Sequence, residues 1–479
     1  MIRFPKLESD KTLRITFWVL LLIRGFLNTV IPLMDKTEAR YAEIARIMAE
    51  TQNWVVLQID YGVPFWAKPP LSSWASALSI TLFDDSAFFV RLPYLLVCGF
   101  IGWWIGKFGQ KSSTSSYLPG IILLSLPEFY LHSGVVSTDV FLTLSITVVM
   151  LSFWKSIQKE ASTAWGYLFF SGLGLGLLAK GPIIGVLTLP PILIWCLIQN
   201  NLISSLKKAP WVLGSFLFIL IALPWYFLAE AASPGFIDYF IVGEHFNRYF
   251  NSGWVGDKYG FAKQQPFGII WGFLLIFCLP WSLIFIQTLW GNFKKLKTDS
   301  WALFLLTWIV WTPFFFTTSK SLIHPYILPV TIPMALWIHH YWFEIKDRII
   351  FLKIGVTIPL ILLVIYLSGF ANPLLENNTD KYLVSDAKNK TIYTLDSKSY
   401  SSQFYTKGNI KKVNSLILDK LIIQPQDFYI LINHKRWKQV PLNVKEKLTL
   451  IKSHKKRALY KYPKKQKSIK NWNKKKDGK

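Results

Sequence analysis

Long apolar segments alternate with short polar ones over most of the chain. Each apolar segment is long enough to cross the roughly 30 Å hydrocarbon layer of a bilayer as an α-helix. The pattern predicts about eleven membrane-spanning helices, at residues 15–33, 88–106, 117–136, 138–154, 165–181, 183–199, 211–229, 267–290, 301–318, 322–343 and 351–370. No small-residue cleavage site follows the first segment, so we expect it to be a retained span and not a signal peptide.

Lysine and arginine residues indicate the side of the membrane on which each loop lies. In the alternating count of spans, the segment before the first span and every loop expected inside contain such residues, namely Arg3, Lys6, Lys11, Arg14, Lys107, Lys111, Lys155, Lys159, Lys207, Lys208, Lys294, Lys295, Lys297, Lys346 and Arg348. Because basic loops usually stay in the cytoplasm, the other loops are expected at the outer face. Two of these outer loops are long, at residues 34–87 and 230–266.

The polar stretch at residues 34–87 has two parts. The first part predicts an amphipathic helix along the membrane surface, with Tyr41, Ile44, Ala45 and Met48 on one face and Glu43, Arg46 and Glu50 on the other. In the second part, Lys68 follows Trp66 and precedes the pair Pro69-Pro70. Because the prolines prevent a helix, they hold the lysine on a stiff turn.

The composition changes after Phe370, where the sequence becomes polar and rich in lysine. Short segments such as Thr391–Leu395 and Phe428–Asn433 are typical of strands. We therefore expect a transmembrane domain at residues 1–371, a small soluble α/β domain at 372–460 and a basic, disordered tail at 461–479. The count of spans places the soluble domain on the outer side.

The overall composition supports a membrane protein. Hydrophobic residues make up 52% of the 479 residues, charged residues only 17%, and the mean hydropathy is +0.33. The expected fold class is an α-helical polytopic membrane protein with a small C-terminal α/β domain. Cys98, Cys196 and Cys278 all lie in apolar runs, so they give no information about a disulfide framework or a metal cluster and are expected to be packing residues. Much of the net charge of +26 lies in residues 451–479, and it favours anionic lipid over nucleic acid as a partner.

Side chains with catalytic chemistry gather in the loops expected at the outer face. They are Asp35, Glu38, Arg40, Lys68, Asp139, Lys180, Glu244, His245, Arg248, Lys320 and His324. Polar groups that several separate loops bring to one membrane surface predict an active site there.

Structural roles remain open for some of these residues. Asp35 and Glu38 have the spacing of a capping box, Asp139 can cap the span that follows it, and Lys180 can snorkel to the membrane surface. The glycines within apolar spans are expected to permit close helix packing and not to bind phosphate. They are Gly99, Gly102, Gly106, Gly172, Gly174 and Gly176.

A set of short motifs carries a resemblance to a known family. The motifs are TEARYAEIARIM (37–48), WAKPPL (66–71), VRLP (90–93), STDVFL (137–142), LLAKGP (177–182), GEHFNRYF (243–250) and YILP (326–329). In this order and spacing, the chain resembles the bacterial membrane glycosyltransferases related to the aminoarabinose transferase of lipid A. These enzymes belong to the wider protein O-mannosyltransferase family, which has the GT-C fold.

The resemblance implies a transferase without a cofactor that works at the outer face of the bacterial cytoplasmic membrane. Such enzymes move a sugar from a polyprenyl phosphate to lipid A, another glycolipid or a protein. The leaving lipid phosphate needs cations, for which the candidates are Arg40, Lys68, Arg248 and Lys320. A carboxylate must orient the acceptor or take its proton, and the candidates are Asp35, Glu38 and then Asp139. Further candidate site residues are Tyr41, Glu244, His245, His324 and Tyr326.

Two positions depart from the family pattern. The family often has Asp-Glu before its Arg-Tyr pair, whereas Thr37 precedes Glu38 here and the nearest aspartate is Asp35. The lipid A enzyme also has a glutamate before the lysine of the proline turn, where this chain has Ala67. Since His245 and His324 are too few to form a metal site alone, no essential metal is expected.

Two other classes of protein are alternatives. A transporter or flippase of a lipid-linked sugar would share the spans and the outer-face cations. However, the sequence shows no internal repeat, and Glu128 and His132 are among the few ionisable residues at mid-span depth. The other alternative, an assembly scaffold built on the C-terminal domain, has little support from the motifs.

Overall fold

The computed structural model describes residues 8–108, 114–250, 254, 256–260, 264–319, 321–387, 390–423 and 427–463. The chain forms two compact units. The first unit contains Met1–Ile31 and Ile44–Phe370, and the second contains Pro32–Glu43 and Ala371–Lys479. Residues 32–43 of the polar stretch at 34–87 therefore group with the C-terminal part of the chain.

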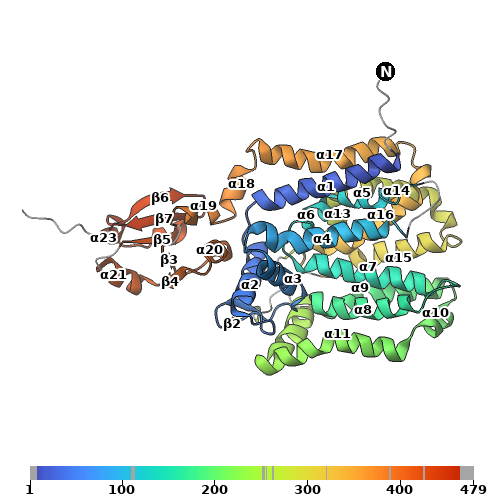
Figure 1. Cartoon of the computed structure of the whole chain (residues 1–479), viewed down its shortest axis with the longest axis horizontal. Helices are drawn as coiled ribbons and strands as arrows, with labels where there is room; N and C mark the ends of the chain where they lie inside the picture. Colours follow the sequence, from blue (N-terminus) through green and yellow to red (C-terminus); the bar gives the residue numbers. More distant parts are fainter. Residues whose placement is uncertain are drawn as a thin grey trace, which may run out of the picture. The chain divides into compact units, whose positions relative to one another are not determined.

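The first unit is a bundle of helices, most of which run side by side (Figure 1). Its α-helices are α1 (Asp10–Val30), α2 (Thr37–Thr51, whose first turns belong to the second unit), α3 (Leu71–Leu82), α4 (Ala87–Ile105), α5 (Leu118–Leu124), α6 (Pro127–His132), α7 (Thr138–Ser156), α8 (Ala164–Lys180), α9 (Ile183–Ile198), α10 (Leu202–Lys208), α11 (Trp211–Ala232), α12 (Arg248–Phe250), α13 (Ile269–Phe277), α14 (Trp281–Asn292), α15 (Ser300–Phe316), α16 (Leu328–His340) and α17 (Arg348–Leu367). The other elements are the hairpin β1 (Gln58–Asp60) and β2 (Val63–Pro64), the π-helix η1 (Asp238–Asn247) and the short 3-10 helices η2 (Phe293–Lys295), η3 (His324–Ile327) and η4 (Trp342–Glu344).

The helices follow the apolar segments closely, and the predicted class of α-helical membrane protein is confirmed. Five helices, α1, α4, α7, α11 and α17, are long and apolar enough to cross a membrane, and the bent pair of α13 and α14 raises the number to six. The shorter apolar helices α3, α9 and α15 fall below that length. The count of about eleven spans stays a prediction.

Several predicted spans are not single straight helices, among them 322–343, which is divided into η3, α16 and η4. The segment at 117–136 is divided into α5 and α6, and α6 starts at Pro127, whose missing N–H fits the first turn of a helix. The segment at 267–290 bends by 105° between α13 and α14, just before Pro280. The first of these breaks produces the short helix α6, which carries Glu128 and His132.

Helix α8 packs closely against its neighbours because it carries glycines. A Cβ atom at Gly172 would lie 2.8 Å from Val149 of α7, and one at Gly176 would lie 2.3 Å from Ile184 of α9. At Gly174 the neighbour is Ile221 of α11, at 3.0 Å. For these three glycines, the prediction of close helix packing is confirmed.

The predicted helix at the start of the polar stretch is confirmed as α2. Its predicted division into an apolar and a water-facing face is wrong, because Glu43 and Arg46 are buried as deeply as Ile44. Arg46 is tolerated there because it forms an ion pair with Glu50, at 2.5 Å, and donates to the hydroxyl of Tyr61 at 3.2 Å.

The second unit contains a mixed five-stranded sheet with the strand order β4-β3-β5-β7-β6. Strand β3 is parallel to β4 and β5, whereas β7 is antiparallel to β5 and β6. The strands are β3 (Ile392–Leu395), β4 (Ile410–Val413), β5 (Phe428–Asn433), β6 (Thr449–Ser453) and β7 (Arg457–Tyr462). The short helices are α18 (Asn372–Asn377), α19 (Lys381–Val384), η5 (Ser385–Ala387), α20 (Tyr400–Tyr405), α21 (Ser415–Ile423), α22 (His434–Trp437) and α23 (Leu442–Lys445).

The side chains of the central strand β5 stabilise this sheet by packing into two hydrophobic clusters. Phe428, Ile430 and Ile432 pack into one hydrophobic cluster, and Tyr429 and Leu431 pack into another. Since alternate side chains of a strand point to opposite faces, the sheet is covered on both faces. The α/β character predicted for this region, with strands at 391–395 and 428–433, is confirmed.

Candidate active site

The turn that carries Lys68 is fixed from several sides within the first unit. The indole nitrogen of Trp66 donates to Ser233 Oγ at 2.8 Å, and its backbone N–H donates to the hydroxyl of Tyr259 at 3.1 Å. The Tyr259 hydroxyl in turn donates to the carbonyl of Pro64 at 2.9 Å. After the turn, α3 begins directly behind Pro70. The lysine is therefore mounted on a rigid support that combines the proline turn with the loop after α11.

Lys68 and Arg248 converge on the carboxylate of Glu244. Lys68 Nζ lies 3.0 Å from Glu244 Oε2, and Arg248 Nη1 lies 3.0 Å from the same oxygen. Glu244 is in the π-helix η1, and Arg248 starts α12 one turn later. The Glu244 side chain is only 2% exposed, whereas those of Lys68 and Arg248 are 19% and 31% exposed. A buried carboxylate thus holds two cations that reach the surface.

The charges in this cluster shift the pKa values of Glu244 and Arg248. Although burial alone would raise the pKa of Glu244, the charges of Lys68 and Arg248 lower it below its usual range. Conversely, Glu244 raises the pKa of Arg248 against the effect of burial. The carboxylate of Glu244 is therefore held in its charged form, and it orients both cations before any ligand arrives.

A second ion pair joins α7 and α8 beside this cluster. Lys180, the last residue of α8, lies 2.5 Å from Asp139 in the first turn of α7. Its ammonium also lies over the ring of Tyr326, 4.4 Å from the ring centre. Helix α8 can end at Lys180 because Gly181 adopts a φ of +85°, a conformation that favours glycine.

His245 connects the two ion pairs. Its Nε2 atom lies 3.3 Å from the carbonyl of Lys180, and its Nδ1 atom lies 2.8 Å from the carbonyl of Phe240. Burial lowers the pKa of His245, and the nearby charge of Lys68 lowers it further. The imidazole is therefore neutral at pH 7 and holds the end of α8 against η1.

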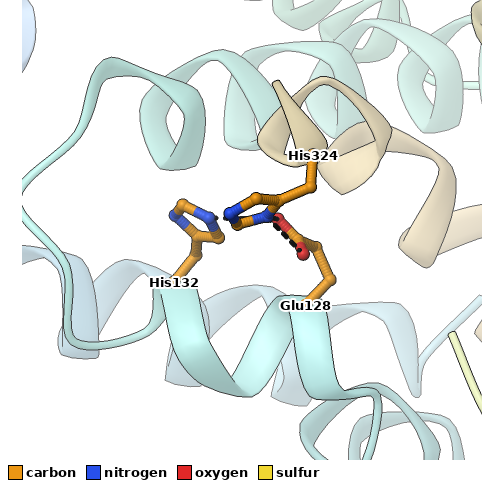
Figure 2. Close-up of side chains that lie close together, drawn as sticks. All are labelled: Glu128, His132 and His324. Atoms are coloured by element: carbon orange, nitrogen blue, oxygen red, sulfur yellow. Dashed lines mark hydrogen bonds and ion pairs between the residues drawn. The ribbon is translucent and has the colours of Figure 1, made fainter. Parts of the chain in front are cut away.

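A third group of polar side chains lies between α6 and η3 (Figure 2). Glu128 and His132 are one helical turn apart on α6, and both are buried. His324 Nδ1 lies within hydrogen-bonding distance of both Glu128 oxygens, at 3.0 and 2.9 Å. Glu128 and His132 were not among the site residues expected from the sequence, although their spacing of four residues could have indicated a shared face.

Asp35, Glu38, Arg40 and Tyr41 belong to the second unit. Asp35 accepts hydrogen bonds from the backbone N–H of Ser401, at 3.0 Å, and from its hydroxyl. Burial raises the pKa of Asp35, and the hydrogen bond from the Ser401 hydroxyl opposes this rise.

The other members of this group have local partners. Glu38 accepts from the backbone N–H of Met34 at 3.1 Å, and Arg40 lies over the rings of Tyr41 and Tyr400. The carboxylate of Asp35 is thus held by Ser401, and that of Glu38 by the residues just before α2.

The structure therefore brings together one part of the set expected from the sequence. Lys68, Asp139, Lys180, Glu244, His245, Arg248 and Tyr326 form one connected group in the first unit. His324 lies two residues before Tyr326 in the sequence and forms an ion pair with Glu128. Lys320 lies outside the described residues. Asp257, 3.8 Å from Arg248, was missed, because nothing in its local sequence indicates that partner.

Comparison with known proteins gives both sequence and structural matches. Residues 13–240 match the family described as dolichyl-phosphate-mannose-protein mannosyltransferase. The undecaprenyl phosphate-alpha-4-amino-4-deoxy-L-arabinose arabinosyl transferase of Enterobacter sp. (strain 638) is 29% identical over 321 residues, which cover 64% of this chain and 54% of that protein. The protein of the same description from Aeromonas hydrophila is 30% identical over 312 residues, covering 64% of this chain and 55% of that protein. The chain thus spans about half the length of the curated relatives it matches.

The fold has close counterparts among solved structures. The crystal structure of ArnT from Cupriavidus metallidurans bound to undecaprenyl phosphate superposes with a TM-score of 0.75 and 16% identity, over 95% of this chain and 98% of that one. The apo structure of that protein gives a TM-score of 0.71 and 15% identity, over 94% of this chain and 98% of that one. The matches confirm the resemblance indicated by the motifs, and the superpositions confirm the fold expected from it.

Proposed function

Because the chain is related to the membrane glycosyltransferases that include the lipid A aminoarabinose transferases, we propose that it transfers a sugar from a polyprenyl-phosphate donor to lipid A or another glycolipid. The curated relatives carry an undecaprenyl-phosphate-linked aminoarabinose in their description, and one structural neighbour is bound to undecaprenyl phosphate. These names support the donor class proposed here.

The observation that carries this proposal is the convergence of Lys68 and Arg248 on Glu244. During transfer, the acceptor oxygen forms a bond to the anomeric carbon while the bond from that carbon to the phosphate oxygen breaks. The departing phosphate gains negative charge, which positioned cations stabilise. Lys68 and Arg248 are partly exposed and already oriented by a buried carboxylate, as this role requires. Lys180, paired with Asp139, is the next cation of the same group.

An acceptor hydroxyl must lose its proton during this step, whereas an acceptor phosphate needs only to be oriented. We assign that proton to a carboxylate, with Asp35 as the first candidate and Glu38 and Asp139 as the others. The raised pKa of Asp35 supports its choice, because a base with a pKa nearer to neutrality accepts a proton more readily. We also place the reaction at the outer face of the cytoplasmic membrane, on the basis of the alternating basic loops.

The test uses the purified full-length chain in detergent with undecaprenyl-phosphate-linked 4-amino-4-deoxy-L-arabinose and extracted lipid A. Transfer should add the mass of one sugar to lipid A and release undecaprenyl phosphate in equal amount, both measured by mass spectrometry. A parallel reaction with a hexose on the same carrier identifies the sugar class. If neither sugar leaves its carrier in the presence of lipid A, other glycolipids or membrane proteins, the transferase proposal fails. Movement of the intact donor across liposomes would then identify a flippase.

A further inference from the structure

Glu128, His132 and His324 form a cluster whose donor atoms point toward one another (Figure 2). One donor atom from each residue lies within 4.8 Å of the other two. Glu128 Oε1 lies 3.0 Å from His132 Nε2 and 3.0 Å from His324 Nδ1. Two histidines and a carboxylate therefore face one small volume.

The state of His132 suggests that hydrogen bonding alone does not account for the cluster. The residue is 3% exposed, and its Nε2 atom faces Glu128 Oε1 at 3.0 Å. Its other ring nitrogen, Nδ1, is buried and forms no hydrogen bond with the described residues. A buried polar nitrogen without a partner is unfavourable. A metal ion in the small volume that the three donor atoms face would give the ring a stronger reason to be buried there.

We propose that Glu128, His132 and His324 bind a divalent transition-metal ion of the Zn²⁺ class. Two imidazole nitrogens and one carboxylate oxygen form a donor set that suits Zn²⁺, and three protein ligands leave one coordination position open. A magnesium or calcium ion would instead require mainly oxygen ligands. A divalent cation also neutralises the carboxylate of Glu128, whose side chain is 0% exposed.

The cluster is rigid enough to serve as such a site. Glu128 and His132 lie four residues apart on α6, which places both side chains on one face of the helix. The ring of His324 stacks on Phe277 of α13, with ring centres 4.7 Å apart. The His324 side chain is 35% exposed, so an ion has a path into the otherwise buried group.

The site differs from the Lys68 group and has its own role. The sequence predicts no essential metal, because the outer loops offer only His245 and His324 as ligands and Glu128 and His132 lie within a predicted span. In the structure, His324 begins η3, and Tyr326 follows two residues later beneath the ammonium of Lys180. A bound ion would fasten η3 to α6 and thereby position Tyr326. The ion thus acts as a structural support beside the proposed transfer site, and its binding does not depend on the identity of the sugar.

The test measures metal binding directly. The full-length chain is purified through a histidine-free affinity tag, stripped with EDTA, dialysed against ZnCl₂ and analysed for zinc by mass spectrometry. We expect about one zinc per chain in the wild type, and at least about tenfold less in His132→Ala and Glu128→Gln, because each loses a ligand. His340→Ala is the matched control, because His340 contacts Asp299 at 2.7 Å and lies outside the cluster.

Three results would overturn the proposal. The first is a wild type that binds no zinc after dialysis, and the second is a His132→Ala variant that keeps its zinc. The third is a wild type that binds as much magnesium after dialysis against MgCl₂ as it binds zinc after dialysis against ZnCl₂. Each variant is first checked by gel filtration. If His132→Ala or Glu128→Gln aggregates, His324→Gln replaces it, because its side chain is partly exposed and its loss should disturb the fold least. Since zinc content is measured without sugar transfer, failure here is separate from failure of the proposed function.

Discussion

The ammonium group of Lys68 lies 3.0 Å from the buried carboxylate of Glu244, a residue 176 positions further along the chain. The contact joins the proline turn before α3 to the π-helix η1. Since Arg248 binds the same carboxylate, one buried anion orients two cations. Glu244 thus fixes the positions of two positive charges at the surface of the first unit.

Replacement of Lys68 should separate a phosphate ligand from a residue that only contacts lipid headgroups. We expect Lys68→Ala to lose most turnover even at saturating donor, because a cation that stabilises the leaving phosphate acts in the transition state. Lys68→Arg should keep part of the turnover, since the charge remains while its geometry changes. Turnover is measured with purified enzyme and polyprenyl-phosphate sugar. Lys207→Ala, at an exposed lysine of α10, is the control; wild-type turnover of Lys68→Ala would remove Lys68 from the site.

The Glu244 cluster also predicts a pH dependence of stability. The folded state lowers the pKa of Glu244 below its ordinary value of 4.5, so the unfolded state binds its proton more readily. The stability that Glu244 contributes is therefore present above about pH 4.5 and is lost as the pH falls through the folded pKa. Glu244→Gln should lower the free energy of unfolding at pH 7 by about 1.5–3 kcal/mol, the range for hydrogen bonds to charged groups.

Thermal unfolding at a series of pH values between 7 and 3 provides the measurement. The difference between the melting temperatures of wild type and Glu244→Gln should shrink as the medium becomes acidic. A difference that stays constant over the whole range would show that Glu244 is not ionised in the folded protein.

Local sequence patterns predicted the helices well because apolar length determines where a chain can cross a bilayer. The ends of α4, α8, α9 and α15 lie within two residues of the predicted segments. The same patterns located the turn of Lys68, whose prolines act on the adjacent backbone. Structural features that depend only on neighbouring residues were therefore predictable from the sequence.

Partners distant in sequence were not predictable in this way. The carboxylate of Asp35 binds Ser401, 366 residues away, and nothing in the sequence around Asp35 indicates that partner. Nothing in the sequence around Glu244 indicates a π-helix, and this unusual winding places its carboxylate opposite Lys68. Similarly, hydropathy assigned Glu128 to a span, while the break before Pro127 turns it toward His324.

A pair of substitutions tests whether Asp35 is the base or only an anchor. Asp35→Asn should lower transfer by about 10²-fold or more, the contribution expected of a positioned base. Ser401→Ala removes the hydroxyl that binds the same carboxylate but leaves the charge. It should keep transfer within a few-fold of wild type. Initial rates and the amount of folded protein in the membrane are measured for both, and equal losses in the two variants would assign Asp35 to anchoring.

The orientation of the chain can be tested with a single introduced cysteine. The native Cys98, Cys196 and Cys278 are buried and should react little. A cysteine at Gln58, in the β1 hairpin, is expected to react with a membrane-impermeant thiol reagent in intact spheroplasts. A cysteine at Lys207, in a loop expected inside, should react only after lysis. The reverse pattern would overturn the assignment of sides made from the basic loops.

Gly181 should tolerate no side chain, because it ends α8 beside the His245 contact. Its φ of +85° is unfavourable for other residues, and a Cβ atom would lie 2.6 Å from the ring of Phe240 and 3.0 Å from that of His245. We expect Gly181→Ala to destabilise the protein by about 1–3 kcal/mol through backbone strain and to lower transfer, since Lys180 is displaced from Asp139. Gly291→Ala is the matched control, because a Cβ atom there meets nothing within 4 Å. Lying inside helix α14, it should be neutral or stabilising by up to about 1 kcal/mol. Melting temperatures of the two variants in detergent provide the measurement, and a Gly181→Ala protein as stable as Gly291→Ala would contradict the role of Gly181.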